Sequence, residues 1–455
     1  MSNRPWVNSN ERIGPDDNLS DPFLKAVSPE QDFRVGVELE QFLVSRDSFE
    51  AVGYFDDSGI QTVLKAFQTK FDWNAVFEND NVIALNKDSL TITLEPGGAL
   101  EFVSPPLENI NQIDQVISSF EQELVEILKS SNLDALPLGY LPFDTLESVK
   151  LVPKSRYDFM YDYMPKVGSR GREMMKLTSS IQVAIDYSSE EDACRKMRLA
   201  ALASPFFIAL SSSSLIKGGK PDHLASQRAD IWANTDPARS GVPSFQIKND
   251  ASFEDYVNWA LKAPIYFIVR DGQNFPAGGI SFSEFIEGKF DFGKIENDPY
   301  PVRADWEQHL STLFPWIRLR HYVEVRSFDM GPPQAQRAAT ALVKGLFYSE
   351  KSMSGMDKIL HFNDSRSLSE LFSAVSQDGL DARLEGVPIR SVAEHLVNIA
   401  EDALIKADLG EERFLNYYKE KIEKWSKKSE IESASKDTKG YIASRSQRTL
   451  LNKLF

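Results

Sequence analysis

Carboxylate side chains recur in this sequence at alternating positions, a pattern typical of strands with one apolar and one acidic face. In residues 34–43, Glu38 and Glu40 alternate with Val35, Val37 and Leu39. Successive side chains of an extended chain point to opposite faces, so the two carboxylates lie on the same side. Three further segments repeat the pattern. Their polar residues are Glu95 and Glu101 in 90–103, Gln182 in 180–186, and Glu324 with Arg326 in 321–329.

These acids would converge on one concave surface if the four strands pair in one sheet. Like charges crowded at low dielectric are costly, and protonation or bound cations relieve the cost. An all-oxygen donor set favours Mg²⁺ or Mn²⁺ over zinc. The five histidines have no zinc-like spacing, and the chain has one cysteine. The alternative is that one face of each strand simply meets water, as in many antiparallel sheets.

Composition limits the partners of this chain. It has 455 residues, with 51 basic and 67 acidic side chains and a net charge of −16, and 42% of its residues are hydrophobic. The hydrophobic content is sufficient for a full core. The acidic surplus repels phosphate backbones and anionic lipid, so we expect a small-molecule partner and neither nucleic acid nor a membrane.

Cys194 is the only cysteine, so the chain can form no internal disulfide, which fits a reducing compartment. The longest apolar stretch, 199–210, is interrupted by Pro205 and is shorter than the roughly 20 residues that span a bilayer. Acidic residues in 1–32 fit neither a signal peptide nor a transit peptide. We therefore expect a cytoplasmic protein.

The order of expected elements indicates one α+β domain rather than several. Residues 1–32 are rich in Asn, Asp, Ser and Pro and are expected to be a loosely ordered leader. Residues 33–455 are expected to form one catalytic domain, in which extended segments dominate at first and 330–455 is mainly helical. No P-loop and no glycine-rich dinucleotide motif follows a strand. The run Ser211 to Ser214 lacks a nucleophile-elbow pattern and is interpreted as a helix end.

Several motifs, taken in order, resemble the plant-type glutamate-cysteine ligases. They are GVELEQF at 36–42, LEPGGALE at 94–101, RYDFM at 156–160, YMPKVG at 163–168, SIQVAID at 180–186, RADIW at 228–232, TDPARSG at 235–241, PIYF at 264–267, HLSTLFP at 309–315 and YVEVR at 322–326. Each motif alone is weak, whereas the ordered set is specific.

The resemblance implies a glutamine-synthetase-like fold, in which a curved antiparallel sheet forms a funnel surrounded by helices. It also implies ATP-dependent joining of the glutamate γ-carboxylate to the cysteine amine through a γ-glutamyl phosphate. This reaction is the first step of glutathione biosynthesis. The implied partners are glutamate, cysteine and ATP, with Mg²⁺ or Mn²⁺. The sequence leaves the oligomeric state open.

The resemblance also implies roles for individual residues. Mg²⁺ held by the acidic set would bridge the triphosphate and neutralise developing charge. The expected metal ligands are Glu38, Glu40, Glu95, Glu101, Gln182 and Glu324. Arg228 is expected to hold the glutamate α-carboxylate and Arg326 to stabilise the transferring phosphoryl group. Arg156 and Lys166 are expected to bind carboxylate or phosphate, and Trp232 and Tyr266 to line the acceptor pocket.

Two other functions remain open from the sequence. One is a related γ-glutamyl or carboxylate-amine ligase with a different acceptor amine. The other is a catalytically inactive binding protein on the same fold, which the complete carboxylate set disfavours.

Overall fold

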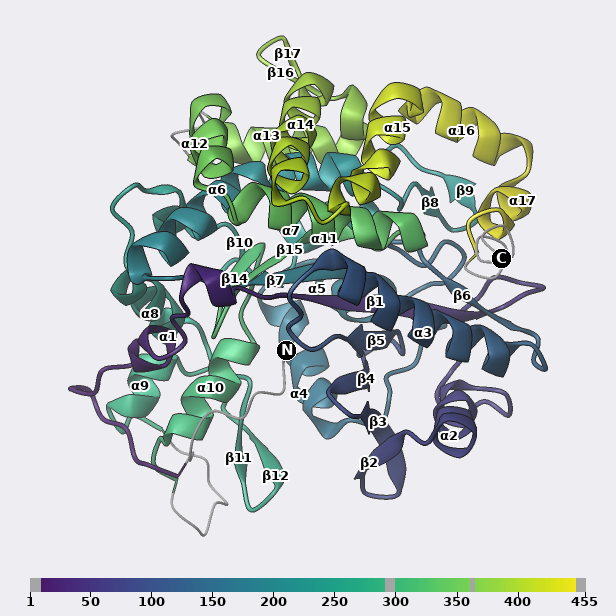
Figure 1. Ribbon diagram of the computed structural model, residues 1–455. Helices are drawn as coiled ribbons and strands as arrows, with labels where there is room; N and C mark the ends of the chain where they lie inside the picture. The colour runs from purple at the N-terminus through teal and green to yellow at the C-terminus, as the bar shows by residue number, and fades with distance from the viewer. Residues whose placement is uncertain (1–9, 291–298, 361–364, 447–455) are drawn as a thin grey trace.

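The computed structural model describes residues 10–290, 299–360 and 365–446, and a large antiparallel sheet runs through its centre (Figure 1). Over these residues the sheet has nine strands, in the order β14-β15-β7-β1-β5-β4-β3-β2, with β6 also paired to β1. The strands are β1 Val35–Ser45, β2 Asn74–Glu78, β3 Asn81–Lys87, β4 Leu90–Leu94, β5 Leu100–Val103, β6 Leu133–Leu136, β7 Ser180–Ile185, β14 Ile317–Leu319 and β15 Val323–Asp329.

The register of these strands aligns the polar residues that the sequence singled out. On β1, Glu38 lies opposite Gln182 of β7, and Glu40 lies opposite Glu101 of β5. Glu95 follows the end of β4, where its backbone N–H donates to the carbonyl of Ala99 at 2.9 Å. The prediction that the four segments pair in one antiparallel sheet of an α+β fold is confirmed.

Two helices cover the apolar face of the sheet. Helix α6, Glu190–Ser211, packs on β15, and α11, Pro333–Phe347, packs on β7 and β1. The start of α6 follows from its sequence, because Ser189 accepts a hydrogen bond from the backbone of Asp192 and three acids occupy the first turn. Val35, Val37 and Leu39 of β1 are buried on the face of the sheet that these helices cover.

The opposite face of the sheet is only partly covered. Helices α4, Ser155–Tyr163, and α10, Arg303–Ser311, lie on that side together with the hairpin of β11, Phe267–Arg270, and β12, Gln273–Pro276 (Figure 1). A cavity remains between them and the polar face. The other helices in the first two thirds of the chain are α1 Asp21–Leu24, α2 Ile60–Phe71, α3 Ile110–Leu128, α5 Gly171–Leu177, α7 Gln227–Ala233, α8 Phe253–Lys262 and α9 Phe282–Ile286.

The last part of the described chain is built largely of helices, which gather on the side of the sheet away from α4 and α10 (Figure 1). They are α12 Glu350–Ile359, α13 Ser365–Asp378, α14 Ile389–Ala407, α15 Asn416–Lys424, α16 Lys427–Lys436 and α17 Thr438–Ala443, with one short hairpin of β16 Arg383–Leu384 and β17 Val387–Pro388. Residues 361–364 and 447–455 of the expected helical part lie outside the described residues.

Part of the expected leader, 1–32, packs against the rest of the chain where the structure describes it. Residues 1–9 lie outside the described residues. Phe23 is fully buried and packs edge-on against Phe253 and Tyr256, and the carbonyl of Leu19 accepts a hydrogen bond from Trp306 at 3.1 Å. The packed structure therefore begins before Phe33, because apolar residues within a polar segment find a place in the core.

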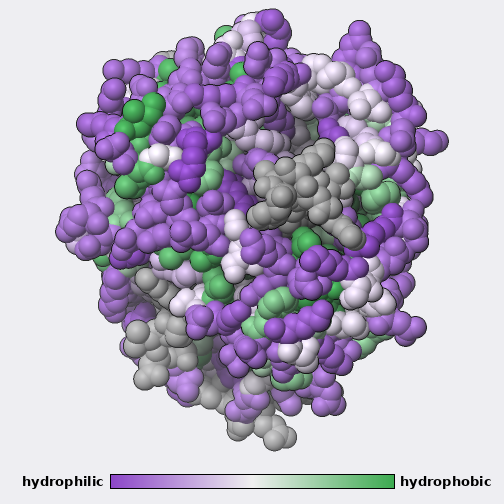
Figure 2. Space-filling view, turned by 45° about the vertical axis from the view of Figure 1, so that its right-hand side comes forward, coloured by the Kyte–Doolittle hydropathy of each residue, from purple (hydrophilic) through white to green (hydrophobic). Residues whose placement is uncertain are grey.

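The surface agrees with the composition. Figure 2 shows one face on which hydrophilic residues predominate and hydrophobic ones are scattered. Within the described ranges, every helix is too short or too polar to cross a bilayer.

Candidate active site

A cavity of about 790 Å³ opens over the polar face of the central sheet. It is lined by both acidic and cationic side chains. The acids and their amide are Glu38, Glu40, Glu78, Glu95, Glu101 and Gln182, and the cations are Lys154, Arg156, Arg318, Arg320 and Arg326. Trp232 and Glu307 also line it. The structure thus brings most of the residues predicted from the sequence to one wall.

The acidic side chains in this cavity are buried close to one another. Glu38, Glu40 and Glu101 are each less than a tenth exposed. Burial raises the pKa of all three, and repulsion between neighbouring carboxylates raises it further, so that the pKa of Glu40 is about 7. Such a group favours a proton or a cation in place of full negative charge.

Gln182 connects the acids to the catalytic candidate Arg326. Its Nε2 donates to Oε1 of Glu40 at 2.6 Å, and its Oε1 accepts a hydrogen bond from Nη1 of Arg326. Ser180 also donates to Glu40, through its backbone N–H at 2.7 Å and its hydroxyl at 2.9 Å. These contacts fix the orientation of the Gln182 amide, with its oxygen toward the arginine.

Glu324 is clamped between two arginines. Its Oε2 accepts a hydrogen bond from Arg326 at 2.8 Å and lies 2.8 Å from Nε of Arg318. Burial alone would raise the pKa of Glu324, but the two guanidinium groups outweigh it and hold the pKa at about 2. Glu324 is 1% exposed and is not part of the cavity wall.

The acidic cluster of the cavity is the predicted metal site. Among residues 10–290, 299–360 and 365–446, no three His, Cys, Asp or Glu side chains are arranged to hold a metal ion as they stand. The donor chemistry nevertheless fits a hard cation, since the set is all oxygen and Oε1 of Glu38 and Oε1 of Glu324 are buried without hydrogen-bond partners. The metal-ligand assignment remains a prediction.

A cationic group stands beside the acids at the end of β4. Nζ of Lys154 donates to the Thr93 hydroxyl at 2.6 Å and to the Leu94 carbonyl at 2.9 Å. Arg156 donates to the hydroxyl of Tyr157 at 2.9 Å. Burial, together with the neighbouring Arg156, lowers the pKa of Lys154 to about 7. An anionic ligand in the cavity would restore the full charge of this lysine.

Sequence reasoning missed Lys154, Arg318, Arg320 and Glu307 as cavity residues. Lys154 stands alone just before α4, so no periodic pattern marks it. Arg318 and Arg320 alternate with Leu319 in the same way as the predicted carboxylates, a signal that the sequence did contain. Glu307 belongs to a helix whose position relative to the sheet has no local signature.

Arg228 lies next to the cavity but is not part of its wall. Its guanidinium is 1% exposed and lies 5.5 Å from the ring of Trp232 and 5.4 Å from that of Trp316. Nη2 donates to the carbonyl of Arg326 at 2.7 Å. Arg228 therefore touches two residues that line the cavity, Trp232 and Arg326.

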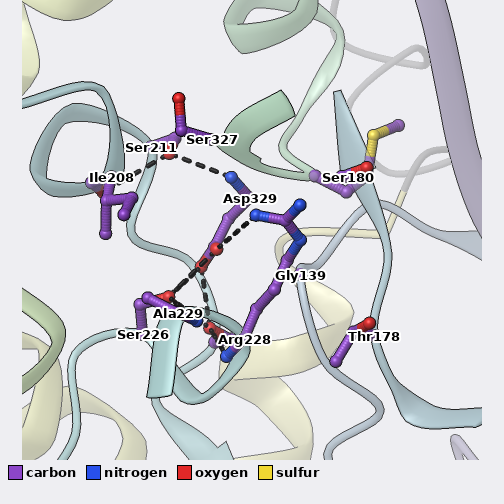
Figure 3. A network of polar contacts seen from close by, with 12 residues as sticks. Gly139, Thr178, Ser180, Ile208, Ser211, Ser226, Arg228, Ala229, Ser327 and Asp329 are labelled. Atoms are coloured by element: carbon purple, nitrogen blue, oxygen red, sulfur yellow. Dashed lines mark hydrogen bonds and ion pairs between the residues drawn. The ribbon is translucent and has the colours of Figure 1, made fainter. Parts of the chain in front are cut away.

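Asp329 is the counter-charge of Arg228 (Figure 3). Its Oδ1 lies 3.9 Å from Nη1 of the arginine. The carboxylate also accepts hydrogen bonds from the hydroxyls of Ser214 at 2.7 Å and Ser226 at 3.0 Å, and the backbone N–H of Asp329 donates to Oγ of Ser211 at 3.0 Å. The serine run after α6 thus holds the aspartate in place.

Besides Glu324 and Arg228, two further predicted site residues do not line the cavity. Tyr266 is buried with its ring 3.9 Å from the guanidinium of Arg239. Lys166 is exposed in a short 3₁₀ turn, Met164–Lys166. Both lie in motifs of the resemblance, but the fold places their side chains elsewhere.

Comparisons with known proteins identify the family of this chain. The model of glutamate-cysteine ligase family 2 (GCS2) matches residues 34–447. The chain is 33% identical to the chloroplastic glutamate-cysteine ligase B of Oryza sativa subsp. japonica over 86% of this chain and 78% of that protein. It is also 33% identical to the chloroplastic glutamate-cysteine ligase of Arabidopsis thaliana over 84% of this chain and 72% of the relative.

A solved structure shows the same fold. The glutamate-cysteine ligase of Francisella tularensis in complex with AMP matches with a TM-score of 0.59 and 14% identity, over 92% of this chain and 88% of that chain. The resemblance predicted from the motifs is confirmed: the chain belongs to glutamate-cysteine ligase family 2.

Proposed function

We propose that this protein is an ATP-dependent glutamate-cysteine ligase that joins the γ-carboxylate of L-glutamate to the amine of L-cysteine. The observation that carries the proposal is one cavity in which buried carboxylates stand beside Lys154, Arg156 and Arg326. Its support is membership of a family whose named relatives are glutamate-cysteine ligases. The product, γ-glutamylcysteine, would begin glutathione biosynthesis.

The reaction proceeds in two displacements. An oxygen of the glutamate γ-carboxylate attacks the terminal phosphorus of ATP, and ADP leaves. The amine of the acceptor then attacks the acyl carbon, loses a proton and expels phosphate. Both steps bring anions together, so stabilisation of negative charge is the main task of the protein.

The cationic side chains carry out that task at the cavity wall. Lys154 and Arg156 lie beside Glu95 and Glu101, where they can neutralise phosphate oxygens. Arg326 is oriented by Glu324 and Gln182, and is proposed to stabilise the transferring phosphoryl group. Lys166 is exposed and away from the cavity, so Lys154 is the better candidate for the lysine contact to phosphate.

The acidic set is proposed to bind Mg²⁺ or Mn²⁺ with ATP. The ligands would come from Glu38, Glu40, Glu95, Glu101, Glu324 and Gln182, all on or next to the polar face of the sheet. When bound, the metal supplies charge neutralisation for the triphosphate.

Arg228 is proposed to act on glutamate through its contacts rather than directly. It supports the backbone of Arg326 at 2.7 Å and lies against Trp232, and both of these residues line the cavity. Trp232 remains the candidate for a wall of the acceptor pocket. Tyr266, buried under Arg239, would shape that pocket from behind the wall.

The test of this function is ADP release by the full chain with Mg²⁺, ATP and L-glutamate, measured against a panel of acceptor amines. Cysteine should give the highest kcat/KM, and another amine that clearly exceeds it would assign the protein to a related γ-glutamyl ligase. Absence of turnover with every amine would instead indicate a binding protein. Glu324→Ala, checked for folding, is the matched inactive control.

A further inference from the structure

Arg320 is a buried cation of the cavity that forms no ion pair within 4 Å among the described residues. It follows β14 in the turn to β15, where its backbone N–H donates to the carbonyl of Tyr322 at 2.8 Å. The residue is 7% exposed and lines the cavity. Its Nε has no hydrogen-bond partner, and no carboxylate of the described chain forms an ion pair with its guanidinium.

The two neighbouring arginines of the cavity differ in this respect. Arg318 and Arg326 are both paired with Glu324 at 2.8 Å. A buried charge without an ion-pair partner is destabilising. Arg320 is therefore available to an anionic group of a ligand that enters the cavity.

Glu307 is the complementary group in the same cavity. It lies on α10, whose residues Ala304, Gln308 and Ser311 also line the cavity at helical spacing. Glu307 is half-buried. Burial raises the pKa of this carboxyl to about 7, and the charge of Arg320 opposes the rise more than that of Arg303 does. The two side chains nevertheless form no ion pair within 4 Å of each other.

We propose that Arg320 and Glu307 form a subsite for the α-carboxylate and α-ammonium groups of an amino-acid substrate. A guanidinium binds a carboxylate through two parallel hydrogen bonds, and a carboxylate binds an ammonium group. One positive and one negative group, too far apart to pair, match the zwitterionic end of an amino acid. A phosphate chain would instead be repelled by Glu307.

The position of the subsite agrees with this assignment. Arg320 lies past the β14 end of the sheet, whereas Glu40, Glu101 and Lys154 lie toward β4 and β5. A substrate anchored by its α groups at Arg320 would extend along the polar face, with its other end toward the acids and Arg326. The inference rests on the proposed function, since either glutamate or the acceptor supplies such an end.

The test measures binding by the full chain, without turnover, by calorimetry. The ligands are L-glutamate with 4-aminobutyrate, which lacks the α-carboxylate, and glutarate, which lacks the amine. L-cysteine with cysteamine forms the second set, and ATP with Mg²⁺ is the third ligand. The variants are Arg320→Gln, Arg320→Lys and Glu307→Gln. Arg366→Gln, an exposed arginine of α13 that is paired with Glu370 outside the cavity, is the matched control.

Arg320→Gln should weaken the binding of one amino acid by roughly 30-fold or more while leaving its analogue without the α-carboxylate unchanged. If the variant no longer binds glutamate more tightly than 4-aminobutyrate, the subsite belongs to glutamate. If it no longer binds cysteine more tightly than cysteamine, the subsite belongs to the acceptor. Glu307→Gln should remove the preference for the amine of the same ligand. The Arg320→Lys variant should bind the amino acid with intermediate affinity. This result would show that Arg320→Gln loses a contact with the ligand and not its fold.

Unchanged amino-acid binding in Arg320→Gln, or weakened binding of ATP alone, would overturn the inference. These outcomes are distinct from failure of the proposed function. A wild-type protein that binds glutamate but releases no ADP would disprove the ligase activity and leave the subsite standing. If a variant with both Glu307 and Arg320 replaced made γ-glutamylcysteine as well as the wild type, the ligase activity would stand and the subsite would be disproved.

Discussion

Arg326 and Glu324, two residues apart on β15, are joined by a hydrogen bond of 2.8 Å between Nη1 and Oε2. The register of β15 with β7 shifts between Val325 and Phe328, and at this irregularity Arg326 also donates to Gln182. A regular strand would place side chains two apart side by side and parallel. The irregularity lies at Arg326, whose side chain contacts both Glu324 and Gln182 and lines the cavity.

Replacing Glu324 should destabilise the protein as well as stop turnover. Glu324→Gln removes the negative charge shared by Arg318 and Arg326. Leaving these buried guanidinium groups unpaired should lower the free energy of unfolding by about 3–5 kcal/mol. Urea denaturation measures this loss. The matched control is Glu370→Gln, whose exposed pair with Arg366 should contribute about 1 kcal/mol or less. Equal losses of stability in Glu324→Gln and Glu370→Gln would show that Glu324 does not balance the charges of the two buried arginines.

Replacing Glu101 should separate metal binding from stability. Glu101→Gln removes one of the carboxylates whose mutual repulsion raises their pKa values. The thermal midpoint without Mg²⁺ should therefore stay equal or rise. The Mg²⁺ concentration for half-maximal ADP release should rise by roughly 10-fold, on the scale of changes near metal sites. An unchanged Mg²⁺ dependence would remove Glu101 from the metal-ligand set.

Replacing Arg228 should affect glutamate more than ATP. Arg228→Ala removes the support of the Arg326 backbone and the packing against Trp232. The KM for glutamate should rise at least 10-fold, about 1.4 kcal/mol, with a smaller change in the KM for ATP. Asp329→Asn removes the negative charge next to Arg228 and should also raise the KM for glutamate. Equal changes in both KM values would show that the arginine supports the cavity as a whole.

His309 should make the protein acid-sensitive. The ring is 2% exposed, with Nε2 2.8 Å from the carbonyl of Ala260, and burial lowers its pKa to about 3. Below pH 6.5 the unfolded chain takes up a proton that the folded chain refuses until about pH 3. Stability is therefore full above pH 6.5 and is lost as the pH falls, by up to about 1.4 kcal/mol per unit.

His309→Gln tests this source of pH dependence. An amide can keep the hydrogen bond to the Ala260 carbonyl without titrating. The free energy of unfolding of the variant, measured from pH 7 to pH 4.5, should fall less steeply than that of the wild type. Parallel slopes would show that other groups cause the acid loss.

The sheet and its acidic face were predictable because strand alternation is a local signal. Glu38 and Glu40 share a face by geometry alone, and pairing with β5 and β7 then brings Glu101 and Gln182 to them. Arg320 alternates with Leu319 and carries the same local signal, but Glu307 was not predictable. It lines the same cavity as Arg320 only because α10 folds back over the sheet, a relationship that no local pattern in the sequence records.

Arg228 shows the limit of carrying a role over by motif. The motif RADIW placed the arginine correctly beside Trp232, yet burial keeps its guanidinium off the cavity wall. The buried leader residue Phe23 shows the same limit for composition, because a polar segment can still supply one aromatic side chain to the core.

The most direct test of the account uses L-glutamate carrying ¹⁸O in its γ-carboxylate. The full chain is incubated with this substrate, ATP, Mg²⁺ and L-cysteine, and the products are measured by mass spectrometry. The account predicts γ-glutamylcysteine and phosphate in equal amounts, with one ¹⁸O transferred to each phosphate. Phosphate without the label, or no cysteine-dependent product, would contradict it.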